Sequence, residues 1–85
     1  MVFRSPTLSV NHDSPMPLFF QVKQKMRDEV LRSGMSPGAQ IPSEAELKKV
    51  FGVSRVTLRR AIDELVREGV LYSRQGMGHF VANPD

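Results

Sequence analysis

The 85-residue sequence contains no cysteine, which excludes a disulfide scaffold, a thiolate zinc site and a thiol nucleophile. Its only histidines, His12 and His79, lack the spacing of metal ligands, so neither a metal nor another cofactor is expected. No apolar run approaches the roughly 20 residues that cross a bilayer, and the N-terminus lacks the apolar core of a signal peptide. These absences predict a soluble, cytoplasmic protein that has no membrane partner.

The length and charge of the chain exclude further classes. A chain this short forms one domain and buries only roughly 60 to 65% of the surface that its unfolded form exposes. Such a core cannot surround a deep substrate pocket, so no enzyme is expected. Twelve Lys and Arg residues against nine Asp and Glu residues give a formal net charge of +3. The resulting pI of about 9.8 lies in the range of domains that bind nucleic acid.

The first third of the chain divides into a tail and a helix. Residues 1–15 have no apolar period and are rich in Ser, Pro and Asn, which predicts a flexible tail before a folded domain over residues 16–82. A helix with a 3.6-residue apolar period is predicted from Pro17, in the first helical position, to a cap at Gly34. Its apolar stripe comprises Leu18, Phe19, Val22, Met26, Val30 and Leu31. Its polar face comprises Gln21, Lys23, Gln24, Lys25, Arg27 and Asp28.

Two closely spaced helices are predicted over residues 43–51 and 54–68, after a short strand at 39–41. Ser43 has capping-box spacing to Glu46, and only Val53 separates the terminating Gly52 from the next cap, Ser54. The buried stripe of the second helix consists of Leu58, Ala61, Ile62 and Leu65. Two helices joined by so tight a turn are typical of a helix-turn-helix, whose second helix enters the DNA major groove.

Two short strands, at residues 70–72 and 79–81, are predicted around the glycine-marked turn 75–78. A glycine-rich tip lets the backbone approach the sugar–phosphate chain or enter the minor groove, although an ordinary turn that only closes the fold stays an alternative. The complete order is α-β-α-α-β-β, which makes the predicted fold class α+β, a winged helix-turn-helix.

The predicted double-stranded DNA contacts come from the helix caps, the outer face of the second helix of the pair, and the hairpin bend. They are Ser43, Ser54, Arg55, Val56, Thr57, Arg59, Arg60, Arg74, Gln75 and Gly76. Arginine binds guanine through two hydrogen bonds, and an exposed valine suits a thymine methyl group. The alternative is that Arg59–Asp63 and Arg60–Glu64 form i,i+4 ion pairs on a solvated helix, each worth about 0.2–0.5 kcal/mol.

These motifs together resemble the DNA-binding domain of the GntR family over residues 17–81. The resemblance rests on Ile41-Pro42-Ser43-Glu44, Phe51-Gly52-Val53-Ser54-Arg55, Thr57-Leu58-Arg59-Arg60-Ala61 and Glu68-Gly69. The ending Arg74-Gln75-Gly76-Met77-Gly78-His79-Phe80-Val81 is most similar to the HutC-type subgroup. The sequence departs from the family at Ala45 and Met77, where basic residues are common, so one DNA contact is lost and the hairpin tip is less positive.

The resemblance implies a bacterial, metabolite-responsive repressor that forms a homodimer on a palindromic operator. It implies DNA contacts from Ser54, Arg55, Thr57, Arg59 and the Gln75-Gly76 tip, and a separate effector-binding domain after a linker that starts at residues 83–85. This domain alone is then expected to be monomeric without DNA. The sequence leaves two other classes of protein as alternatives: a winged helix that contacts only protein, and an accessory domain of a nucleic-acid enzyme. Arginines at 55 and 59 argue against a winged helix that contacts only protein. The absence of a carboxylate cluster or a phosphate loop argues against a domain of a nucleic-acid enzyme.

Overall fold

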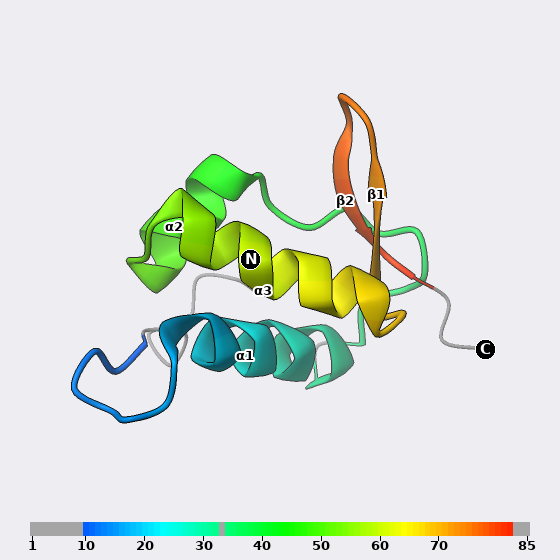
Figure 1. Cartoon of the computed structure of the whole chain (residues 1–85). Coiled ribbons are helices and arrows are strands. Elements are labelled where there is room, and N and C mark those ends of the chain that lie inside the picture. The colour runs from blue at the N-terminus through cyan, green and yellow to red at the C-terminus, as the bar shows by residue number, and fades with distance from the viewer. Residues whose placement is uncertain (1–9, 33, 83–85) are drawn as a thin grey trace.

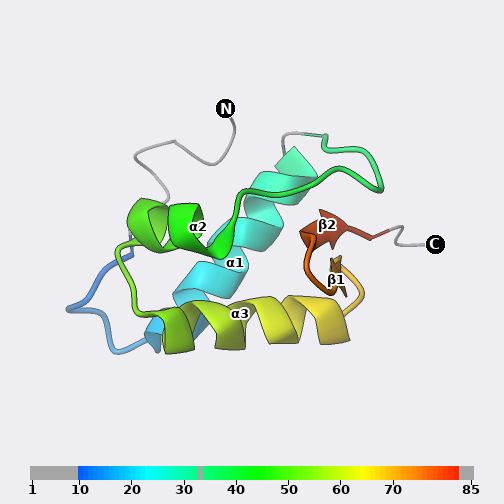
Figure 2. The ribbon, with the colours of Figure 1, turned by 90° about the horizontal axis from the view of Figure 1, so that it is seen from above.

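The computed structural model describes residues 10–32 and 34–82, which form three helices and one β-hairpin (Figure 1). The elements are α1 (Leu18–Arg32), α2 (Glu44–Phe51), α3 (Arg55–Arg67), β1 (Leu71–Arg74) and β2 (Gly78–Val81). Helices α1 and α3 lie side by side, α2 covers the N-terminal half of α3, and the hairpin stands at the C-terminal end of α3 (Figures 1 and 2). This arrangement confirms the predicted winged helix-turn-helix.

One apolar core holds the three helices together. The predicted stripe of α3 is buried in full, since Leu58, Ala61, Ile62 and Leu65 are each at most 1% exposed. Across from it, α1 contributes Val22, Met26 and Val30, and α2 contributes Leu47 and Phe51. Burying one large aliphatic or aromatic side chain contributes about 1.5–3 kcal/mol. This shared core therefore fixes α2 and α3 relative to each other and to α1.

Three residues of α1 differ from the sequence prediction. Leu31, assigned to the apolar stripe, is 66% exposed because it lies about 100° around the helix from the buried Val30. Gln21 and Lys23, assigned to the polar face, are both buried. Lys23 Nζ pairs with Glu64 Oε1 at 3.0 Å and with Glu68 Oε2 at 2.9 Å. Each buried polar group thus has partners on another segment, which no periodicity within α1 indicates.

Gln21 binds the segment that precedes α1. Its side-chain oxygen accepts the Asn11 N–H at 2.8 Å, and its amide nitrogen donates to the carbonyls of Asn11 at 3.0 Å and Met16 at 2.9 Å. Val10 also packs against the core. The second part of the predicted tail therefore lies against α1, whereas residues 1–9 lie outside the described residues. The helix itself begins at Leu18, one residue after Pro17.

The hairpin pairs β1 and β2 in antiparallel register, from Leu71 opposite Val81 to Arg74 opposite Gly78. The strand predicted at 39–41 is reduced to a single bridge between Gln40 and Phe80. Pro42 follows directly and has no N–H to donate, so the ladder cannot continue. The bridge still fastens the segment between α1 and α2 to β2, on the edge that β1 leaves unpaired.

Candidate nucleic-acid interface

The turn between α2 and α3 is fixed by caps at both of its ends. Gly52 has φ 65°, a left-handed conformation, and its N–H donates to the Lys48 carbonyl at 2.8 Å. Ser54 begins α3, and its Oγ accepts the Thr57 N–H at 3.2 Å and donates to Thr57 Oγ1 at 3.1 Å. Ser43 caps α2 in the same way, accepting the Glu46 N–H at 3.2 Å. The predicted caps are confirmed, and the start of α3 is exposed.

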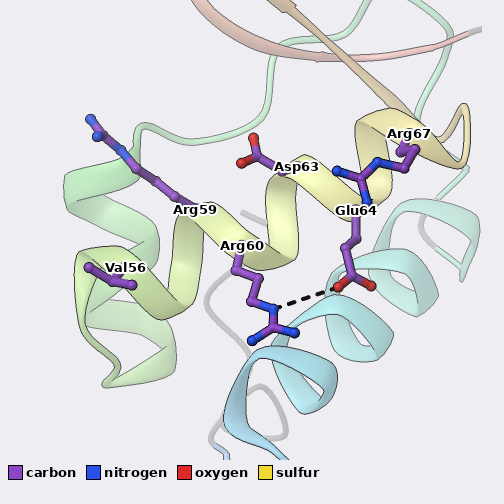
Figure 3. A pocket seen from close by; sticks show the side chains of 6 residues that line it. All are labelled: Val56, Arg59, Arg60, Asp63, Glu64 and Arg67. Carbon is purple, nitrogen blue, oxygen red and sulfur yellow. Dashed lines mark ion pairs between the residues drawn. The ribbon is translucent and has the colours of Figure 1, made fainter.

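The outer face of α3 carries most of the predicted contact residues. Val56 is 79% exposed although it is apolar, and Arg55 beside it is exposed as well. A shallow groove runs along this face (Figure 3), lined by Val56, Arg59, Arg60, Asp63, Glu64 and Arg67. An exposed valine flanked by arginines offers both an apolar contact and hydrogen-bond donors, which is the combination that base edges in the major groove accept.

The two candidate arginines of α3 have different partners. Arg60 Nε lies 3.8 Å from Glu64 Oε2, the i,i+4 pair that the sequence allowed, and its guanidinium lies 3.8 Å from the centroid of the Phe19 ring. Arg59 Nε instead donates to Glu44 Oε1 of α2 at 3.0 Å, so the alternative pair with Asp63 is replaced by one across the helix-turn-helix. The Arg59 side chain stays 60% exposed.

The hairpin turn places the remaining candidates at its tip. Gly76 has φ 75°, and the Met77 N–H donates to the Arg74 carbonyl at 3.0 Å to close the turn. Arg74, Gln75 and Gly76 are all exposed. Gln40 Nε2 donates to the Met77 carbonyl at 2.7 Å. Gln40, which the sequence did not indicate, therefore braces the tip against the segment before α2.

A second group absent from the sequence prediction joins the hairpin to the helix-turn-helix. His79 of β2 lies with Nε2 3.3 Å from Glu44 Oε2 and with Nδ1 2.8 Å from Ser73 Oγ. Burial of the Glu44 carboxyl raises its pKa, but hydrogen bonds from Arg59 and His79 outweigh that effect, so its pKa lies below the ordinary 4.5. Glu44 therefore carries its negative charge at neutral pH. In the sequence, Glu44 stands out only within the motif Ile41-Pro42-Ser43-Glu44, which assigns it no contact.

The structure thus divides the predicted contact residues into groups. Ser54 to Arg60 lie along the first half of α3, Arg74 to Gly76 lie at the hairpin tip beyond its other end, and Ser43 caps α2 (Figure 1). Within the described ranges, no three His, Asp or Glu side chains come together as metal ligands. Among those same residues, no helix is both long and apolar enough to span a bilayer.

Comparison with known proteins places the domain in a family. The family model described as "Bacterial regulatory proteins, gntR family" matches residues 19–81. The transcriptional repressor NagR of Bacillus subtilis is 36% identical over 77 residues, which are 91% of this chain and 32% of that protein. The histidine utilization repressor of Pseudomonas aeruginosa is 41% identical over 81 residues, 95% of this chain and 32% of that protein. The chain therefore spans about a third of the length of these relatives.

Solved structures give the same result. The crystal structure of AraR(DBD) in complex with operator ORX1 is similar at a TM-score of 0.80 and 40% identity, over 87% of this chain and 94% of that one. AraR(DBD) in complex with operator ORE1 is similar at a TM-score of 0.77 and 42% identity, over 86% and 89%. The chain therefore belongs to the gntR family of bacterial regulatory proteins, and its winged helix-turn-helix fold is similar to that of AraR(DBD).

Proposed function

We propose that this domain binds double-stranded operator DNA, with α3 in the major groove and the hairpin as a wing beside it. The observation that carries the proposal is the open N-terminal half of α3, where Arg55, Val56 and Arg59 are all exposed next to a capped helix start. The similarity to AraR(DBD), solved in complex with operators, supports it. The family is one of bacterial regulatory proteins, so no catalytic role is proposed for the domain.

Each residue of α3 is assigned a role by its chemistry. Arg55 and Arg59 read guanine, and Val56 contacts a thymine methyl group. Thr57 and the backbone amides that follow Ser54 bind phosphate, which fixes the register of the helix without reading sequence. Ser43 is assigned a phosphate contact at the start of α2.

Arg60 has a second role that competes with DNA contact. Its guanidinium covers the Phe19 ring and faces Glu64, so we assign it chiefly to holding α3 against α1. The wing contributes Arg74, Gln75 and Gly76. Gly76 has no side chain to hold the tip away from the sugar–phosphate backbone, Gln75 supplies a polar contact at the minor groove, and Arg74 supplies a phosphate contact.

For the whole protein we propose a cytoplasmic, metabolite-responsive repressor of the HutC-like subgroup. The Arg-Gln-Gly wing motif supports the subgroup, as does a second histidine utilization repressor, that of Klebsiella aerogenes, at 45% identity over 71 residues. The proposed domain covers residues 16–82, with the preceding residues from Val10 packed against α1, and a linker is proposed from residue 83. Two copies bind a palindromic operator, since each half-site presents the same groove.

The test is selection of bound sequences from a random DNA pool, followed by titration of the 85-residue chain at several salt concentrations. We expect a recurring half-site, and an affinity whose logarithm falls linearly with the logarithm of salt as phosphate contacts release counterions. Enrichment of no sequence would overturn the proposal and favour the winged helix that contacts only protein. Sedimentation at micromolar concentration is expected to show a monomer without DNA.

A further inference from the structure

One carboxylate joins the three parts of the proposed interface. Glu44 is the first residue of α2, Arg59 lies on the outer face of α3, and His79 lies on β2. Oε1 of Glu44 accepts from Arg59 Nε at 3.0 Å, and Oε2 lies 3.3 Å from His79 Nε2. These partners lie 15 and 35 residues away along the chain. Each oxygen of Glu44 thus serves a different DNA-facing element.

The hydrogen bonds around Glu44 are mutually consistent. The tautomer of His79 that carries a proton on Nε2 donates to Glu44, and its Nδ1 then accepts from the Ser73 hydroxyl at 2.8 Å. The side chains of His79 and Glu44 are only 16% and 29% exposed, so both contacts are partly shielded from water. A charge-assisted hydrogen bond in such a setting is stronger than a neutral one and restricts the geometry of its donor.

The contact with Glu44 leaves Arg59 able to read a base. A guanidinium has five N–H donors, of which Nε supplies one. The two terminal nitrogens remain on a side chain that is 60% exposed, and in Figure 3 they point away from α1 and α3. Two hydrogen bonds to guanine require those two terminal nitrogens or one of them with Nε. Because Nε is occupied by Glu44, Arg59 can bind guanine only through its two terminal nitrogens, which we call end-on reading.

We propose that Glu44 is a positioning residue that sets the sequence specificity of this domain by fixing Arg59 for end-on reading of one base and tying the wing to it through His79. The inference rests on the proposed DNA-binding function and deepens it. The Glu44 carboxylate also repels DNA phosphates, so it lowers affinity for every sequence to a similar extent. It raises the relative affinity only for sequences that place a guanine where the held arginine points.

The test compares Glu44→Gln with Glu46→Gln, because both glutamates lie in the first turn of α2 and both changes remove one negative charge. In Glu44→Gln we expect affinity for the selected operator to fall about tenfold, within the range that one two-pronged arginine–guanine contact is worth. Affinity for a scrambled duplex is expected to stay the same or rise. Glu46→Gln is expected to leave the ratio of the two affinities unchanged.

A double-mutant cycle shows whether Glu44 acts through Arg59. In the Arg59→Ala background, Glu44→Gln is expected to change the affinity ratio no further. Glu44→Asp keeps the charge but withdraws the carboxylate, and is expected to lower the ratio in the same direction, which provides a second variant if the glutamine variant is unstable. Equal losses on operator and scrambled DNA, or an additive effect in the Arg59→Ala background, would overturn the inference. Failure of the unmodified domain to discriminate sequences would instead overturn the proposed function.

Discussion

The two sides of α3 carry similar charged residues but use them differently. On the side toward α1 the charges are paired with one another, since Lys23 contacts both Glu64 and Glu68, and Glu64 also faces Arg60. On the outer side, the side chains of Val56 and Arg59 extend away from the core. Figure 3 shows Arg60 and Glu64 directed toward α1, and Arg59 and Asp63 directed away from it.

The role of an arginine is therefore set by the elements packed around it rather than by its own helix. Arg59 and Arg60 are adjacent in sequence, but about 100° of helical rotation separates their side chains. That rotation places Arg60 over the Phe19 ring of α1 and Arg59 beside Glu44 of α2. One guanidinium therefore helps to hold two helices together, and its neighbour is presented to solvent with its terminal nitrogens outward.

The largest expected effect comes from the buried stripe of α3. Leu58→Ala removes a side chain with no exposed surface, and we expect the free energy of unfolding to fall by about 2–5 kcal/mol. Val56→Ala, two residues earlier and 79% exposed, is expected to change it by at most about 0.5 kcal/mol. Urea unfolding followed by circular dichroism measures both. Equal midpoints for the two variants would mean that this stripe is not the core.

The second prediction compares Arg55, which is exposed at the start of α3, with Arg60, which faces α1. Arg55→Ala is expected to weaken operator binding by about 1–3 kcal/mol, because its exposed side chain is assigned to a base. Its stability is expected to stay unchanged. Arg60→Ala is the matched control, expected to lose about 0.5–1 kcal/mol of stability with the Phe19 contact and little of the affinity. A DNA titration and a urea titration of each variant decide the comparison, and the reverse pattern would contradict it.

The sequence predicted those parts of the fold that depend on local periodicity and capping. The α3 stripe repeats every three or four residues, so its buried face follows from helical geometry alone. The caps at Ser43 and Ser54 follow from a hydroxyl three residues before a free backbone N–H. Glycines at 52 and 76 occupy left-handed positions, which their lack of a Cβ favours. Exposure of the candidate contact residues on α3 follows from the same stripe.

The sequence did not predict contacts between elements far apart along the chain. Counting residues along α3 offered Asp63 as a partner of Arg59 only in the alternative to DNA contact, whereas the observed partner is Glu44, 15 residues earlier. Lys23 lies on the polar arc of α1 by periodicity, and its partners are 41 and 45 residues later. The Lys23 pairs depend on how α1 crosses α3, and the Arg59–Glu44 pair depends on how α2 packs against α3. Nothing in the spacing within one helix fixes either arrangement.

The paired side of α3 should also show a characteristic pH dependence. The hydrogen bond between Glu68 and Lys23 lowers the pKa of Glu68 below 4.5. The hydrogen bonds that Lys23 makes to Glu68 and Glu64 raise the pKa of Lys23 above 10.5. The Glu68 contribution to stability is present above pH 4.5 and is lost as the pH falls through the lowered pKa. The Lys23 contribution is present below pH 10.5 and is lost as the pH rises through the raised pKa.

Stability from this pair is therefore expected to be full between about pH 5 and 10 and to decline on both sides. Lys23→Gln is expected to lower the urea midpoint on that plateau and to flatten both declines. Lys49→Gln makes the same charge change on the exposed end of α2 and is expected to leave the profile close to that of the unmodified chain. A Lys23→Gln profile parallel to the unmodified one throughout would show that the pair contributes nothing.

The smallest expected effect concerns the wing, which extends the open side of α3 beyond the helix. Arg74 is exposed at the end of β1, with its guanidinium 5.8 Å from the centroid of the Tyr72 ring, and a contact to a phosphate gives no sequence information. In Arg74→Gln the slope of log affinity against log salt is expected to become shallower by about 0.9, the value for one phosphate contact. When the salt concentration is doubled, the affinity of the unmodified domain is expected to fall by a factor about twofold larger than that of the variant, on operator and scrambled DNA alike.

Met77→Lys adds a charge at the same tip, where the side chain is already 60% exposed, and is expected to steepen the slope by a similar amount. A slope that neither change moves would place the wing away from the phosphates and confine the contact surface to the outer face of α3.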